Sequence, residues 1–161
     1  MDMLKRIVRH KVIYLALLIV AVITVAVVNS DEASANNWQD TAYTFYFSVS
    51  QNATYVASSG RTKQDTSKVY IMCNYAYEPN VSGSLRFNAQ AHGSNNSSSG
   101  FAACTYNGHS TPTYTIYKNT SKYMTNYIRE TNKTYANIYV SKNGMQATFK
   151  GDWSPDNYNC Y

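Results

Sequence analysis

Leucine is nearly absent from the chain beyond residue 35, where Leu85 is the single example. Because leucine is among the residues that most readily fill helices, its absence argues against a helical domain. Tyrosine is abundant instead, since 15 of the 16 tyrosines (all but Tyr14) follow Ala35, together with many asparagines, serines and threonines. Tyrosine and threonine favour strands, whereas asparagine and serine favour turns. The composition therefore predicts an all-β domain.

The sequence also lacks the motifs of the common enzyme classes. It has no Gly-x-Ser-x-Gly nucleophile elbow, no Gly-rich phosphate loop, no Cys-x-x-Cys pair and no histidine pair with metal-ligand spacing. Asp152 and Asp156 lie close in sequence, as a catalytic pair of carboxylates would. They flank a turn, however, where acidic residues are common as solvated capping residues. Cys104 precedes His109 by five residues, without the electropositive setting that activates a thiol. We expect no catalysis, no metal and no cofactor.

Positive charge is present but not concentrated. Beyond residue 35 there are 10 Lys and Arg (14 minus four) and 6 Asp and Glu (9 minus three), a net charge of +4. No run of five or more basic residues occurs there, so we expect a solvated surface and no specific nucleic-acid site.

The first 35 residues have the order of an export signal. Four basic residues between Lys5 and Lys11 precede an apolar run of 17 residues, Val12 to Val28, and Ala33-Ser34-Ala35 supplies small side chains for a cleavage site. We expect a signal peptide over residues 1–35. An uncleaved anchor spanning 12–28 is the alternative, because the run approaches the length that crosses a bilayer. The chain is then either secreted or membrane-anchored with its C-terminal domain outside.

Several segments alternate with the period of two that is typical of half-buried strands. In Thr41 to Ser50 the inward residues are Tyr43, Phe45, Phe47 and Val49; in Lys68 to Tyr77 they are Val69, Ile71, Cys73, Tyr75 and Tyr77. Around Tyr123 to Ile128 the spacing becomes helical and predicts one short helix or turn.

Asn143-Gly144 predicts a β-hairpin, because a two-residue hairpin turn needs positive φ at both central positions. In that register Val140 lies opposite Ala147 and Ile138 lies opposite Phe149, so both apolar sides share one face. Six to seven short strands separated by turns predict a two-layer antiparallel β-sandwich, with a small β-barrel as the alternative. We expect residues 36–161 to form this single β domain.

Three cysteines allow at most one intramolecular disulfide bond. Cys73 shares the inward side of its strand, and Cys104 follows the apolar Phe101-Ala102-Ala103. We expect a bridge between Cys73 and Cys104, which leaves Cys160 as a free thiol or as a link to another chain.

The alternation along each strand predicts that several tyrosines face outward. Tyr135 and Tyr139 lie on the other face of their strand from Ile138 and Val140, and Tyr46 and Tyr70 lie on the other face from the apolar residues of their strands. Rigid tyrosine rings beside short polar side chains suit a glycan or protein ligand. Trp153 is either a plug for the edge of the core or a further stacking residue. We expect a secreted, non-catalytic extracellular interaction protein. The alternatives are a self-associating surface protein linked through Cys160 and a secreted antagonistic, toxin-like protein.

Four segments carry a family resemblance: Arg61 to Tyr70, Tyr127 to Glu130, Tyr135 to Ile138, and Gly151-Asp152-Trp153-Ser154-Pro155-Asp156. The chain resembles small exported β-rich proteins of Gram-positive bacteria that end in a Gly-x-Trp-Ser-Pro-Asp segment, a family of unassigned function. The resemblance covers about half of the chain beyond the leader. It implies export and a single β domain, and it implies no mechanism.

Overall fold

The structure is a computed structural model, and it describes residues 39–157 except 82, 107–108, 111 and 145. Within these residues every regular element is a strand and every strand pair is antiparallel, so the predicted all-β class is confirmed. The strands are β1 (Thr41–Phe47), β2 (Ala53–Tyr55), β3 (Arg61–Thr62), β4 (Val69–Tyr77), β5 (Arg86–Ser94), β6 (Ala102–Ala103), β7 (Thr105–Tyr106), β8 (His109–Ser110), β9 (Tyr114–Tyr117), β10 (Thr120–Met124), β11 (Tyr135–Lys142) and β12 (Ala147–Ser154).

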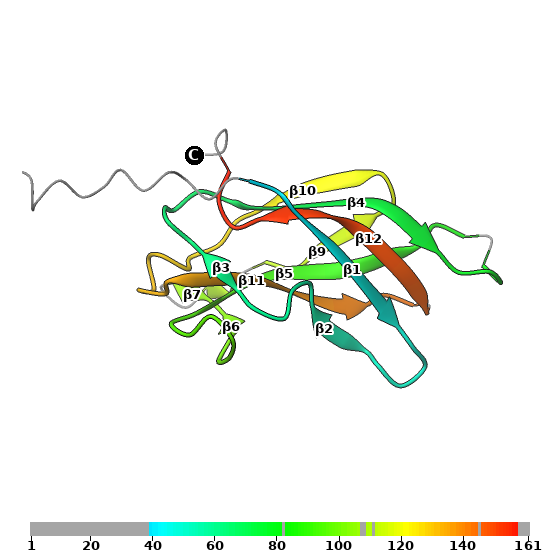
Figure 1. The fold of residues 1–161 in the computed structure, drawn as a ribbon, viewed down its shortest axis with the longest axis horizontal. Helices are drawn as coiled ribbons and strands as arrows, with labels where there is room; N and C mark the ends of the chain where they lie inside the picture. The colour runs from blue at the N-terminus through cyan, green and yellow to red at the C-terminus, as the bar shows by residue number, and fades with distance from the viewer. Residues whose placement is uncertain (1–38, 82, 107–108, 111, 145, 158–161) are drawn as a thin grey trace, which may run out of the picture. The chain divides into compact units, whose positions relative to one another are not determined.

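Most strands belong to two sheets. Sheet A has the order β1-β12-β4-β10, and sheet B has the order β2-β11-β5-β6, with β3 also paired to β11 and β9 to β5. β7 and β8 pair with each other. Figure 1 shows β1, β12, β4 and β10 in one layer and β11, β5 and β2 in a second layer. Several strands have only two or three residues, so the described part contains more strands than the six to seven expected.

The two sheets share one core. Phe87 of β5 packs edge-on against Phe45 of β1, with ring centroids 5.1 Å apart, and against Phe149 of β12 at 4.9 Å. Such edge-to-face contacts between aromatic rings stabilise a core beyond the area they bury. The three side chains come from both sheets and are almost entirely buried, so the predicted inward face of β1 is confirmed there. Val49, also expected inside, lies beyond the end of β1 and is 76% exposed.

The hairpin predicted around Asn143-Gly144 is wrong. β11 belongs to sheet B and β12 to sheet A, so the segment between them passes from one layer to the other. Val140 and Ala147 are both buried, as the parity predicted. Two strands point their apolar residues into the same core whether they pair within one sheet or lie in opposite sheets. The alternation of apolar residues alone therefore did not distinguish a hairpin from a connection between sheets.

β4 contains a β-bulge that reverses its alternation. Gly151 of β12 is opposite Cys73 and Lys150 is opposite Tyr75, which leaves Asn74 as an extra residue. Tyr75 and Tyr77 consequently face outward, and the prediction that they lie in the core is wrong.

Around Tyr123 to Ile128, where the spacing predicts a short helix or turn, the structure has no helix but a strand end followed by a turn. β10 continues to Met124, and a single turn follows, in which the Thr131 amide donates to the Tyr127 carbonyl at 2.9 Å. Met124 and Ile128 are both buried, so their helix-like spacing arises from a strand end and a turn that enter the same core.

The last described segment is held by buried polar contacts. The side chains of Lys63 and Asp156 are completely buried, with Lys63 Nζ 2.7 Å from Asp156 Oδ1. Arg61 donates to the carbonyl oxygen of Trp153 at 3.3 Å, and its guanidinium lies 5.6 Å from the Trp153 ring centroid. Two of the segments that carried the family resemblance, 61–70 and 151–156, therefore lie side by side.

Candidate functional site

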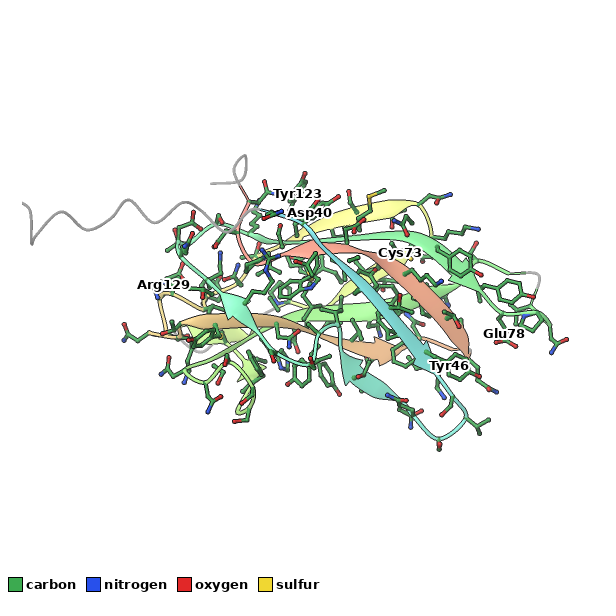
Figure 2. All side chains as sticks on the ribbon, viewed as in Figure 1. Asp40, Tyr46, Cys73, Glu78, Tyr123 and Arg129 are labelled. Carbon is green, nitrogen blue, oxygen red and sulfur yellow. The ribbon has the colours of Figure 1, made fainter. Side chains whose placement is uncertain are left out.

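The outer face of sheet A displays a group of exposed tyrosines that we call the tyrosine face: Tyr46, Tyr75 and Tyr77, with Thr148 and Lys150 between them. Tyr46 of β1, Thr148 of β12 and Tyr77 of β4 are in register across three strands, and Lys150 is in register with Tyr75 in the next row on the same face. The three tyrosines are 47%, 39% and 53% exposed. Figure 2 shows Tyr46 on β1 at the end of sheet A where this face lies.

Contacts within the tyrosine face hold its rings in place. Lys150 Nζ lies 5.2 Å from the centroid of the Tyr75 ring, a cation–π contact that orients the ring and places a positive charge beside it. The rings of Tyr75 and Tyr77 are 6.3 Å apart and tilted by 33°. Tyr46 Oη donates to Gln146 Oε1 at 3.3 Å. The face therefore offers three broad rings, hydroxyl groups and one cation to a ligand.

A hollow adjoins the tyrosine face at the loop between β4 and β5. It has a volume of about 440 Å³ and shares Tyr77 with the face. Its other walls combine apolar, aromatic and charged side chains: Val81, Leu85, Tyr117, Lys118 and Glu78. The exposed rings thus continue into a concave surface with both a cation and an anion at its edge.

Tyr70, predicted to face outward, lies at the other end of sheet A. It pairs with Tyr123 of β10, with ring centroids 5.2 Å apart, and Figure 2 shows Tyr123 far from Tyr46 along the sheet. Burial raises the pKa of Tyr70, and the negative charge of Asp40 acts in the same direction. Tyr70 and Tyr46 do not form one site.

Tyr139 lies on the outer face of sheet B, where neighbouring side chains cover it. Its ring stacks on His92 at 5.0 Å and 8°, and Tyr55 packs against it at 5.5 Å. Tyr55 Oη is 3.1 Å from His92 Nδ1 and donates to the Phe101 carbonyl at 3.0 Å. Burial lowers the pKa of His92 to about 4, so the imidazole is neutral at pH 7. Tyr135 is half-buried on the same face. The predicted outward tyrosines are therefore divided between two opposite faces.

Residues 31–157 match the model of a family described as "Protein of unknown function (DUF2712)". The chain belongs to this family. No curated protein and no solved structure matches it. The family match extends over every residue that the structure describes, and the all-β fold of this DUF2712 protein agrees with the resemblance to β-rich proteins.

Trp153 is not available to stack on a ligand, because it is completely buried in this DUF2712 protein. It lies on the inward side of β12 and closes the core beneath Arg61. Trp153 therefore fills the edge of the core and does not face a ligand.

The predicted disulfide bond between Cys73 and Cys104 is not formed. Both cysteines face inward, but Cys73 belongs to β4 of sheet A, whereas Cys104 lies beside Gly93 of sheet B. Burial raises the pKa of both thiols, which disfavours the reactive thiolate. Cys160 and the His109 side chain lie outside the described parts of the chain.

The residues that the structure describes contain no group of three or more His, Cys, Asp or Glu that could hold a metal ion. Asp152 and Asp156 have different surroundings: Asp152 Oδ2 accepts from Asn74 near the surface at 3.4 Å, whereas Asp156 is buried against Lys63. Between residues 39 and 157, no described helix is long and apolar enough to span a membrane, and the predicted leader lies outside that range.

Sequence reasoning missed Tyr75, Tyr77 and Lys150. Strict alternation from Val69 assigns both tyrosines to the core, and the bulge residue Asn74 is an ordinary residue for the outer side of a strand. The bulge therefore has no distinct local signature, and only the pairing with β12 reveals it.

Proposed function

We propose that this chain is an exported, non-catalytic interaction protein that binds an extracellular polysaccharide through the tyrosine face. The observation that carries the proposal is the register of Tyr46, Tyr75 and Tyr77 around Lys150 on one side of sheet A. Tyrosine rings provide apolar faces for sugar rings, and their hydroxyls hydrogen-bond to sugar hydroxyls. The supporting architecture is a two-layer antiparallel sandwich whose rigid strands present these side chains.

The ligand class follows from the form of the surface. Tyr46 lies on β1 and both Tyr75 and Tyr77 lie on β4, with β12 between the two strands. The three rings therefore suit an extended chain of similar units that touches several rings at once. Lys150 beside Tyr75 favours a polysaccharide with anionic groups, such as those of a Gram-positive cell wall. The hollow of about 440 Å³ beside Tyr77 gives a protruding substituent a place to enter.

Export by the segment 1–35 is part of the same proposal, with residues 36–161 as the domain that acts outside the cell. The intact mass of protein recovered from the culture medium of a Gram-positive expression host tests this step. A chain that starts at Asn36 supports it, and a full-length chain confined to the cytoplasm contradicts it.

Binding is tested by co-sedimentation with insoluble cell-wall polysaccharide, using the purified protein and the variant with both Tyr75→Ala and Tyr77→Ala. We expect the double variant to bind at least about tenfold more weakly, or roughly 1.4 kcal/mol. Tyr135→Ala, on the opposite sheet, is the matched control and should bind normally. Equal binding by all three proteins, with circular dichroism showing all of them folded, would exclude the tyrosine face as the binding site.

A further inference from the structure

Lys63 and Asp156 bring a primary amine and a carboxyl group into contact in the interior of the domain. They are 93 positions apart in the sequence, and both side chains are completely buried. Lys63 follows β3, Asp156 follows β12, and Lys63 Nζ lies 2.7 Å from Asp156 Oδ1. Water is excluded from the pair, and an isolated buried ion pair gains little from charge attraction because both ions have lost their hydration.

The polar groups around the pair hold both reactants in position. Lys63 Nζ also donates to the Ser67 carbonyl oxygen at 2.7 Å and lies 3.4 Å from Asp65 Oδ1. The backbone N–H of Gln64 is directed at the Asp156 carboxyl group, 3.1 Å from Oδ2 and 3.3 Å from Oδ1. A backbone donor at a carboxyl oxygen stabilises the negative charge that develops there when a nucleophile adds to the carbon.

The two nearby carboxyl groups have opposite proton affinities. Burial raises the pKa of Asp156, although Lys63 and the Gln64 amide act in the opposite direction. Burial also acts to raise the pKa of Asp65, but hydrogen bonds from Ser67 and the charge of Lys63 outweigh it, so this pKa lies below its ordinary value. Asp65 Oδ2 is buried and accepts no hydrogen bond from the residues that the structure describes. Asp156 thus favours its neutral form, whereas Asp65 favours its ionised form.

We propose that Lys63 and Asp156 condense within the folded chain to form an isopeptide bond, with Asp65 as the residue that moves the proton. A proton first passes from the ammonium group to the Asp156 carboxylate, which gives a neutral amine and a neutral acid. Nζ then adds to Cγ of Asp156, and Asp65 takes a proton from the nitrogen. Asp65 returns that proton to the departing hydroxyl group, the C–O bond breaks, and one water molecule leaves. The product amide carries no charge, so the burial of two ions is relieved.

This inference is independent of the proposed binding function, because it concerns only the interior of the domain. The bond would close a covalent ring between residues 63 and 156 and would fix the C-terminal segment to the body of the fold. In a chain whose Cys73 and Cys104 are not bridged, it provides a cross-link that reductants do not break.

Intact-mass spectrometry of the purified, folded protein tests the bond directly. We expect a mass lower than that of the sequence by one water molecule. Trypsin should then yield a branched peptide in which residues 62–68 are joined to residues 151–161, because cleavage follows Arg61, Lys68 and Lys150 but not the modified Lys63. A full mass for the folded protein, or a water loss confined to a single linear peptide, overturns the proposal.

Two variants assign the roles. Asp65→Asn keeps both reactants, and Asp65 is partly exposed, so this variant is expected to fold and to retain the full mass. Asp152 is a nearby acid outside the cluster, so Asp152→Asn is the matched control. It should lose one water molecule, as the protein without substitutions does. If Asp65→Asn loses water as fully and as fast as the control, Asp65 is not the proton carrier, and that part of the proposal fails.

Discussion

The hydroxyl group of Tyr43 donates a hydrogen bond of 2.9 Å to the main-chain carbonyl oxygen of Met72, although β12 separates the strands of these two residues. The bond passes over Gly151, where a side chain would contact the Tyr43 hydroxyl and overlap the Met72 carbonyl. Burial and, to a smaller extent, the neighbouring Cys73 raise the pKa of Tyr43, so its phenol stays protonated and can donate. This crossing lies beside the bulge that turns Tyr75 and Tyr77 outward.

Gly151→Ala should destabilise the domain by about 2 kcal/mol, because the added methyl group overlaps backbone atoms that cannot move without disturbing the sheet. Urea unfolding followed by tryptophan fluorescence measures the change. Gly83→Ala is the control, since a Cβ at Gly83 meets nothing closer than a Val81 methyl group at 4.0 Å. Similar midpoints for the two variants would contradict the close packing at Gly151.

Tyr43→Phe removes the donor to Met72 while keeping the ring in the core. We expect a loss of about 1 kcal/mol in the free energy of unfolding, the usual cost of one such hydrogen bond. Tyr46→Phe removes a hydroxyl whose bond to Gln146 lies at the surface, and it should change stability by less than about 0.5 kcal/mol. Equal losses in the two variants would show that the crossing bond makes no special contribution.

His92 should make stability depend on pH between about 6.5 and about 4, the ordinary pKa and the lowered pKa in the folded chain. In this range the unfolded chain binds a proton that the folded chain does not, so the free energy of unfolding falls as the pH falls. The contribution is about 3 kcal/mol and is fully lost below the lower pKa.

His92→Gln should remove that part of the pH dependence, which urea titrations at several pH values between these limits can measure. The comparison isolates His92, because the carboxyl groups titrate in both proteins. An unchanged slope in the variant would mean that His92 binds protons equally in the folded and unfolded chains, and would contradict the lowered pKa.

The thiols of Cys73 and Cys104 should react with an alkylating reagent only after unfolding, because both are buried. Labelling in denaturant without any reductant should modify both, as expected when no bridge joins them. Cys160→Ser is the background for this experiment, so that only these two cysteines are counted. Labelling that requires a reductant would instead support the disulfide bond predicted from the sequence.

Alternation along the chain predicted the buried side of β1 correctly, because this strand has one apolar face and a regular ladder. The same rule failed in β4 after Cys73, because a bulge is a property of two paired strands. It also failed to assign partners to β11 and β12. Asn143-Gly144 marked a turn, but of these two residues only Gly144 has a positive φ (99°), so the segment is not the two-residue turn of a hairpin.

The candidate site was predicted only in part. Tyr46 was expected to face outward and belongs to the tyrosine face, whereas Tyr139 is covered and Trp153 is buried. The contact between Lys63 and Asp156 was not predicted, because it joins residues 93 positions apart and no local pattern encodes it. The resemblance had marked both segments without indicating that they meet.

The place of β12 sets the order in which the domain can assemble. β12 follows all the other described strands in the sequence, yet it lies between β1 and β4 in sheet A. A chain that emerges from its N-terminus exposes β1 long before its hydrogen-bonding partner exists, and such non-local pairing is slow. Until β12 (Ala147–Ser154) has been synthesised, Phe45 and Phe47 lack the cover that Phe149 gives them, so folding of this half depends on a distant later segment. Factors that keep the unfinished chain from aggregating during that delay would raise the yield of folded protein more than any change that strengthens a local turn.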